Sequence, residues 1–136
     1  MNYLLTALMS KFSGSSFSTD VGGRIYLDEA PAGAQFPYCV FFIVSGVPDK
    51  TFTEHYTDTA IQFSLFSTSK SAAEITGMYA DLKALLDECS LSITGSSLVW
   101  CREQNLMTMV DEITTLEGTS TVKHWAVDFE ILTSLN

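Results

Sequence analysis

The segment from Gly22 to Val47 constrains the fold more than any other part of this chain, and it reads GGRIYLDEAPAGAQFPYCVFFIVSGV. The Gly22-Gly23 pair breaks a regular backbone, and Arg24 to Leu27 then has the composition of a short extended segment. Prolines and a glycine keep the residues before Tyr38 out of helix. The apolar run from Tyr38 to Val44 predicts a strand that is buried on both faces, or nearly so. No residue here is placed to do chemistry, so the segment indicates architecture and not catalysis.

This succession of elements resembles the tail completion proteins, also called tail terminators, of long-tailed siphovirus-type bacteriophages and gene-transfer particles. The resemblance is carried by Gly23-Arg24-Ile25-Tyr26, by Phe36-Pro37-Tyr38 and by the Ser-Gly-x-Pro sequence after the apolar run. In the rest of the chain it rests on the order of helices and strands. The resemblance implies a structural part of the virion that caps the head-proximal end of the tail tube, and not an enzyme.

Two helices are predicted from apolar side chains at helical spacing. The first covers Tyr3–Phe12 and is expected to end in a flexible link over Ser13–Ser16. The second covers Ala72–Cys89, and Ser71 with Glu74 three residues later forms a capping-box pattern at its start. The apolar stripes comprise Leu4, Leu5, Leu8, Met9 and Phe12 in the first helix, and Ile75, Met78, Tyr79, Leu82, Leu85, Leu86 and Cys89 in the second.

Three further strands are predicted over Ala60–Phe66, Leu98–Val110 and Thr121–Leu132. The first and last alternate apolar and polar residues, as expected for a strand with one buried face. The middle strand is expected to group Val99, Cys101 and Glu103 on one face and Leu98, Trp100 and Arg102 on the other. Together these elements predict an α+β fold in a single domain over residues 1–136, with a mostly antiparallel β-sheet, two α-helices packed on one face, and projecting loops or hairpins.

The chain carries a formal net charge of −9, from 16 acidic and 7 basic residues. This balance argues against a nucleic-acid-binding protein, which needs a basic surface to neutralise phosphates. Acidic copies around a channel would instead repel the DNA backbone and leave DNA free to slide, without sequence-specific binding. A channel lined by Lys11, Lys50, Lys83 and the two arginines would contradict this hypothesis.

Part of the surface is expected to be covered by neighbouring proteins. Charged residues make up only 17% of the chain, against roughly 25% in typical soluble domains, and the mean hydropathy is +0.20. A monomer coated with Ser and Thr would also fit this composition. The strands that are apolar on both faces favour a covered surface.

The three cysteines, Cys39, Cys89 and Cys101, lack a recognisable spacing and predict buried free thiols in a protein folded in a reducing cytoplasm. The first residues lack a basic leader with a cleavage site, and no apolar run approaches the roughly 20 residues of a membrane span. We therefore expect a protein made in the host bacterial cytoplasm with no membrane partner. If the resemblance holds, it leaves the cell in the virion, at the head-proximal end of the tail.

Two polar stretches, Asp49–Thr59 and Asp111–Thr121, are long for ordinary loops and are expected to project toward neighbouring subunits. Phe52 and Tyr56 either anchor a contact or fold back on their own domain. The candidate interface with another subunit, the tail tube or the neck comprises Asp49, Lys50, Phe52, Glu54, His55, Tyr56, Asp111, Glu112 and Glu117.

No catalytic, cofactor or metal site is predicted. The only conceivable four-ligand zinc set, Cys39, Cys101, His55 and His124, has no ligand spacing. The neighbouring acids at Asp28-Glu29, Asp111-Glu112 and Asp128/Glu130 are attributed to solvated edges or subunit salt bridges, and a divalent ion that bridges acids between subunits stays open. Gly22-Gly23 is a turn, because no phosphate-binding motif follows it.

The resemblance implies three protein partners: further copies of the chain in a homo-hexamer, the tail-tube protein, and the head-tail connector or neck protein. DNA would pass through the channel of the ring. The residues alone leave two alternatives open, which are a head-tail connector adaptor protein and a cytoplasmic α+β module that binds a ligand between helix and sheet.

Overall fold

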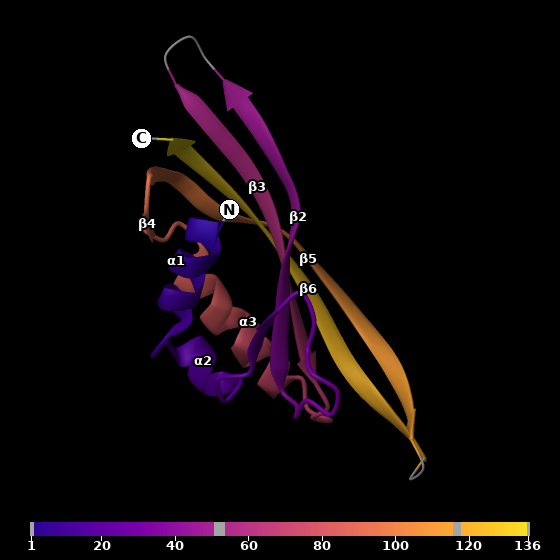
Figure 1. Cartoon of the computed structure of the whole chain (residues 1–136). Helices are drawn as coiled ribbons and strands as arrows, with labels where there is room; N and C mark the ends of the chain where they lie inside the picture. The colour runs from indigo at the N-terminus through magenta and orange to yellow at the C-terminus, as the bar shows by residue number, and fades with distance from the viewer. Residues whose placement is uncertain (1, 51–53, 116–117, 136) are drawn as a thin grey trace.

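The computed structural model describes residues 2–50, 54–115 and 118–135. Its strands form one sheet in the order β1-β2-β3-β6-β5-β4 (Figure 1). Strand β1 runs parallel to β2, and the other neighbouring pairs run antiparallel. The elements in chain order are α1 (Asn2–Phe12), α2 (Ser16–Asp20), β1 (Ile25–Leu27), β2 (Tyr38–Lys50), β3 (His55–Ser67), α3 (Ala73–Leu86), β4 (Ser92–Ile93), β5 (Ser96–Thr115) and β6 (Gly118–Leu135).

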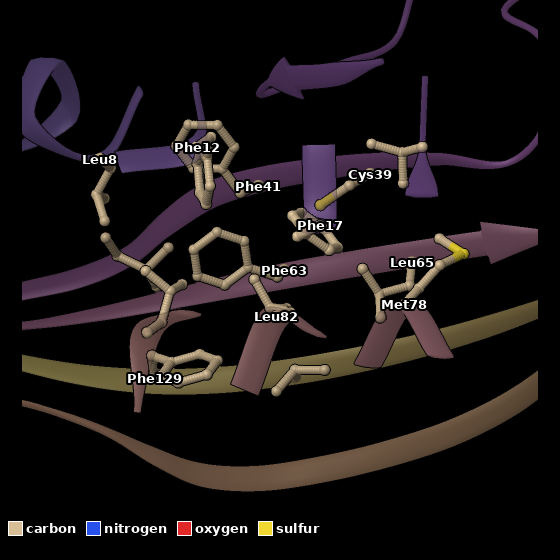
Figure 2. Close-up of a cluster of buried hydrophobic side chains, with 14 of the residues drawn as sticks. Leu8, Phe12, Phe17, Cys39, Phe41, Phe63, Leu65, Met78, Leu82 and Phe129 are labelled. Carbon is tan, nitrogen blue, oxygen red and sulfur yellow. The ribbon is translucent and has the colours of Figure 1, made fainter. Parts of the chain in front are cut away.

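A buried apolar cluster joins the helices to the sheet (Figure 2). Phe63 on β3 lies at its centre, with ring centroids 5.9 Å from Phe12 of α1, 5.5 Å from Phe41 of β2 and 5.6 Å from Phe129 of β6. Helices α2 and α3 contribute further buried side chains, Phe17 and Met78 among them. The helices are short and pack on the sheet, so their apolar stripes supply most of their stability.

The alternation predicted for the two regular strands is confirmed. Alternate residues of β3 and β6 are buried in the cluster, namely Ile61, Phe63, Leu65, Val127, Phe129 and Ile131. The residues between them point to the other side of the sheet, which we call the outer face. The side chains of this outer face do not join the cluster.

The structure corrects the helix predictions in three places. The expected link over Ser13–Ser16 leads directly into a third helix, α2, because the Ser15 side chain caps it by accepting a hydrogen bond from the Ser18 N–H at 3.1 Å. The capping box at α3 is absent, since Glu74 accepts instead from Ser67 Oγ at 2.7 Å. Helix α3 ends at Leu86 and not at Cys89, because the backbone is extended at Asp87.

Three predictions about burial are also wrong. Strand β2 is buried on one face only, so Cys39 and Phe41 are fully buried while Val44 is exposed. Met9 of α1 lies outside the apolar stripe and is exposed. In β5 the pairing with β6 shifts between Leu98 and Trp100, and this irregularity moves Leu98 to the core side and leaves Val99 exposed.

The two long polar stretches are mostly strand. Strand β2 continues to Lys50 and β3 begins at His55, while β5 continues to Thr115 and β6 begins at Gly118. These segments pair with each other residue by residue, so they extend the sheet as two hairpins. Among the residues that the structure describes, no helix is long and apolar enough to cross a bilayer.

A pair of carboxyl groups lies where α2 meets α3. The Asp20 and Asp81 carboxyl groups interact with each other, and the buried Asp20 Oδ2 atom has no hydrogen-bond partner among the residues that the structure describes. Desolvation, followed by hydrogen bonding with Asp81 and the negative charge of Asp81, raises the pKa of Asp20 from 3.8 to about 6. The pair therefore holds a proton at mildly acidic pH.

Truncation of the central ring tests the core. Phe63→Ala should lower the free energy of unfolding by about 3–5 kcal/mol, because it leaves a cavity among the phenylalanines. Val44→Ala, at an exposed position of β2, should change it by no more than about 1 kcal/mol. Urea denaturation followed by circular dichroism measures both, and equal effects of the two variants would contradict this description of the core.

The Asp20–Asp81 pair predicts a pH dependence with a definite sign. Between pH 3.8 and about 6 the folded protein holds a proton that the unfolded chain has lost, so stability should fall as pH rises through this window. Asp20→Asn should flatten this fall and melt above the wild type at pH 7. Thermal melts at pH 4.5 and 7 test this, with Asp49→Asn on the exposed end of β2 as the control. A wild-type melting temperature that rises from pH 4.5 to 7, with an unchanged slope in Asp20→Asn, would refute it.

Candidate assembly surface

The first group of predicted interface residues gathers at the end of the β2–β3 hairpin. Asp49 pairs with Tyr56, and Lys50 pairs with His55. The Tyr56 hydroxyl donates a hydrogen bond to the Glu54 carboxylate. Phe52 lies outside the described residues. The hairpin thus presents a mixed set of charges next to a half-buried tyrosine.

The second group lies on the β5–β6 hairpin. Asp111 and Glu112 are both exposed on β5, opposite Val122 and Thr121. Asp111 Oδ2 is 3.4 Å from His124 Nδ1. Glu117 lies outside the described residues. Figure 1 shows this hairpin at the opposite end of the sheet from the β2–β3 hairpin, so the candidate residues lie in two separate groups.

A row of aromatic rings crosses the outer face, and sequence reasoning missed it. Tyr38 of β2 stacks on Phe66 of β3 at 4.9 Å, and Phe66 stacks on His124 of β6 at 4.3 Å. Tyr26 and Phe36 extend the row, with centroids 6.1 Å and 5.0 Å from that of Tyr38. The rings come from different strands, so only the strand register reveals the row.

A polar cluster lies on the same outer face, nearer the β2–β3 hairpin. The Glu130 Oε1 atom accepts a hydrogen bond from Trp100 Nε1 at 2.9 Å and lies 3.4 Å from an Arg102 guanidinium nitrogen. That guanidinium lies 4.2 Å from the centre of the Trp100 ring. Desolvation and the nearby Glu130 charge raise the pKa of Asp58, against the lowering effect of Arg102.

An open hollow of about 340 Å³ adjoins this cluster. Gln62 Nε2 donates to Asp128 Oδ1 at 3.0 Å within its lining. The sequence placed Trp100 and Arg102 on one face, but it gave no sign that Asp58 and Glu130 from other strands would join them. The lining consists of Val44, Ser45, Val47, Asp58, Ala60, Gln62, Gln104, Asp128, Phe129 and Glu130.

The sheet has two long open edges. Within the described part of the chain, β5 pairs on its outer side with β4 only through Ser96 and Ser97, and the residues after α3 bond to the backbone of Cys101 and Glu103. In that part of the chain, the β5 edge is therefore open from Gln104 onward. At the opposite edge, β1 covers only Cys39 to Phe41 of β2. Exposed apolar side chains lie along the β5 edge, including Met107 and Val110, which are 53% and 68% exposed. An open edge strand with apolar side chains is a template for pairing with another chain.

Arg24 connects the most distinctive parts of the sequence. Its Nε atom donates to the Pro37 carbonyl at 3.0 Å, and its own carbonyl accepts from the Cys39 N–H at 3.0 Å. The Phe36–Pro37 peptide bond is cis. Gly22 adopts a φ of +59°, and a Cβ atom there would lie 2.7 Å from the Arg24 guanidinium. The glycine turn and the Phe-Pro-Tyr loop therefore form one local structure at the junction of β1 and β2.

The residues of the conceivable zinc site are scattered. Cys39 and Cys101 are buried in the core, His55 lies on the β2–β3 hairpin and His124 stacks in the aromatic row. No group of three His, Cys, Asp or Glu side chains that could hold a metal occurs in residues 2–50, 54–115 and 118–135.

Open sheet edges and two long hairpins are typical of a protein that assembles with other chains. The chain belongs to the family described as Tail completion protein gp17, whose family model it matches over residues 3–134. It is therefore a structural protein of the tail of a phage-type virion, where it assembles with other tail and head proteins. The predicted resemblance is confirmed.

Solved structures share this fold. One chain of the virion of a native gene transfer agent particle is 12% identical, with a TM-score of 0.71 over 96% of each chain. A second solved structure, of a protein without a descriptive name, is 12% identical, with a TM-score of 0.52 over 96% of this chain and 94% of its own. Among curated proteins no match was found.

The role of Arg24 can be tested by its removal. Arg24→Met should lower the free energy of unfolding by about 1.5–3 kcal/mol, because it leaves the Pro37 carbonyl without its charged donor. Arg102→Met, which removes a half-exposed ion pair on the outer face, should cost no more than about 1 kcal/mol. Urea denaturation compares the two variants, and an equal or larger loss in Arg102→Met would contradict the assignment.

Proposed function

We propose that this chain caps the head-proximal end of the tail tube as a homo-hexameric ring. The ring ends tail polymerisation and provides the surface on which the head connector docks. The observation that carries this proposal is the match to the tail completion family over residues 3–134. The mechanism is steric: the ring covers the growing surface of the last tube layer and exposes a different one.

The two hairpins favour a protein that contacts neighbours on two sides. They extend the sheet at opposite ends (Figure 1). Strand β5 has 20 residues, which corresponds to roughly 65 Å of extended chain. We assign contacts with the tube on one side and with the neck on the other to these hairpins, through Asp49, Lys50, Glu54, His55 and Tyr56 at one end, and Asp111 and Glu112 at the other.

The open edges support a closed ring of identical subunits. A ring needs two different surfaces on each subunit, each complementary to the other. The β5 edge and the β2 edge lie on opposite sides of the sheet, as this arrangement requires. We infer that the β5 edge of one copy contacts the β2 edge of the next copy. We also propose that residues 1–136 form a single domain, which makes this contact as one unit.

The charge distribution fits a channel through which DNA slides. Asp58, Asp128 and Glu130 lie on the outer face and outnumber Arg102, which pairs with Glu130 there. Lys11 and Lys83 belong to α1 and α3, on the core side of the sheet. If the outer face lines the channel, its carboxylates repel the phosphate backbone. DNA then passes without sequence-specific binding.

The binding-module alternative loses its main support. Such a module needs a polar pocket between helices and sheet. Apolar side chains fill the centre of that layer (Figure 2), and a hollow of about 250 Å³ lies beside it, between the start of α1 and strands β3 and β6. A connector adaptor would act at the same junction of head and tail. Deletion of its gene would leave different incomplete particles from those left by deletion of a tail completion protein.

Complementation of a deletion of this gene tests the ring contact. Met107→Glu on the β5 edge should reduce the titre of joined particles by at least about tenfold, because it adds a negative charge to an apolar contact between acidic copies. Met9→Glu on α1 is the matched control, since the two methionines are 53% and 45% exposed. Thermal melting should show both variants folded.

Full complementation by Met107→Glu would refute the β5 contact. A comparable loss in Met9→Glu would place the contact on the helices instead.

A further inference from the structure

Two of the three cysteines lie against each other, which their spacing along the chain did not indicate. Cys89 follows α3, and Cys101 belongs to β5. The Glu88 N–H donates to the Cys101 carbonyl at 2.6 Å, which holds the residue before Cys89 beside the edge of β5. The two thiols interact with each other, and both side chains pack in the core region.

The two thiols differ in access and in acidity. Cys101 is fully buried, whereas Cys89 is half-buried and lines an open hollow of about 390 Å³. The hydrogen bond with Cys101 lowers the pKa of Cys89 to about 7, and the positive charge of Lys11 adds to this effect against desolvation and the charge of Asp87. The same contact and burial raise the pKa of Cys101. This is the arrangement of an accessible attacking thiol beside a second, resolving thiol.

We propose that Cys89 and Cys101 form a redox-active thiol pair, which closes to an intramolecular disulfide when the protein meets a low-molecular-weight disulfide such as glutathione disulfide. This inference rests on the geometry of the pair and not on the proposed ring.

The reaction balances in two exchange steps. The Cys89 thiolate attacks one sulfur of glutathione disulfide, so a mixed disulfide forms and one glutathione thiolate leaves and takes up a proton. Cys101 then loses its proton to solvent and attacks the Cys89 sulfur, and the second glutathione leaves. The two protein thiols are oxidised, and one glutathione disulfide is reduced to two glutathione molecules.

The bond would tie the end of α3 to β5. It would do so only after the particle leaves the reducing cytoplasm in which it is made, because disulfides persist in oxidising surroundings. A closed loop between positions 89 and 101 restricts the unfolded chain and so favours the folded state.

Thiol counting by mass spectrometry tests the proposal. The folded protein is incubated with glutathione disulfide, then denatured and alkylated. Wild type should change from three alkylated cysteines to one, with peptide mapping that shows Cys89 joined to Cys101 and Cys39 alkylated. Cys39→Ser is the matched control and should form the same bond, because Cys39 is fully buried and does not take part. Cys101→Ser should stop at the mixed disulfide on Cys89.

Three results would overturn the proposal: wild type that keeps three alkylatable thiols, wild type that stops at a mixed disulfide, or a bond that involves Cys39 or a second chain. Each of these is measured on the wild-type protein, so the test does not depend on the folding of a variant. None of them bears on the capping function.

Discussion

The packing of Phe63 between the helices and its neighbouring strands is the contact on which the rest of the structure depends. Phe12, Phe41 and Phe129 surround its ring at centroid distances of 5.5–5.9 Å. Because side chains alternate along a strand, this contact decides which residues turn to the outer face. The positions of the aromatic row, of the polar cluster around Glu130 and of the exposed Met107 follow from this register. A shift of one residue in register would bury those groups and expose the core.

The local signals in the sequence were sufficient for much of the fold. The alternation in β3 and β6 and the apolar stripe of α3 predicted their buried faces, because both signals depend on neighbours within a few residues. The ends of elements were less predictable. Helix α2 depends on a single serine cap, and the strands of both hairpins are polar, so their composition resembled loops.

The candidate assembly surface depends on long-range pairing, which a single sequence does not reveal. Tyr38, Phe66 and His124 come together only through the pairing of β2, β3 and β6. The open β5 edge is a property of the sheet order. The described members of the predicted interface lie on the two hairpins, but the sequence could not show that these hairpins lie at opposite ends of the sheet. The role of Arg24 was likewise hidden, although its motif carried the family resemblance.

Electron microscopy of lysates from the source particle with this gene deleted tests the proposed capping function most directly. We expect filled heads that lie apart from tails, and tails of uncontrolled length, because no ring would end tube growth or offer a docking surface. Heads that carry a complete neck but no tail would assign the chain to the connector side. Normal joined particles would contradict the account.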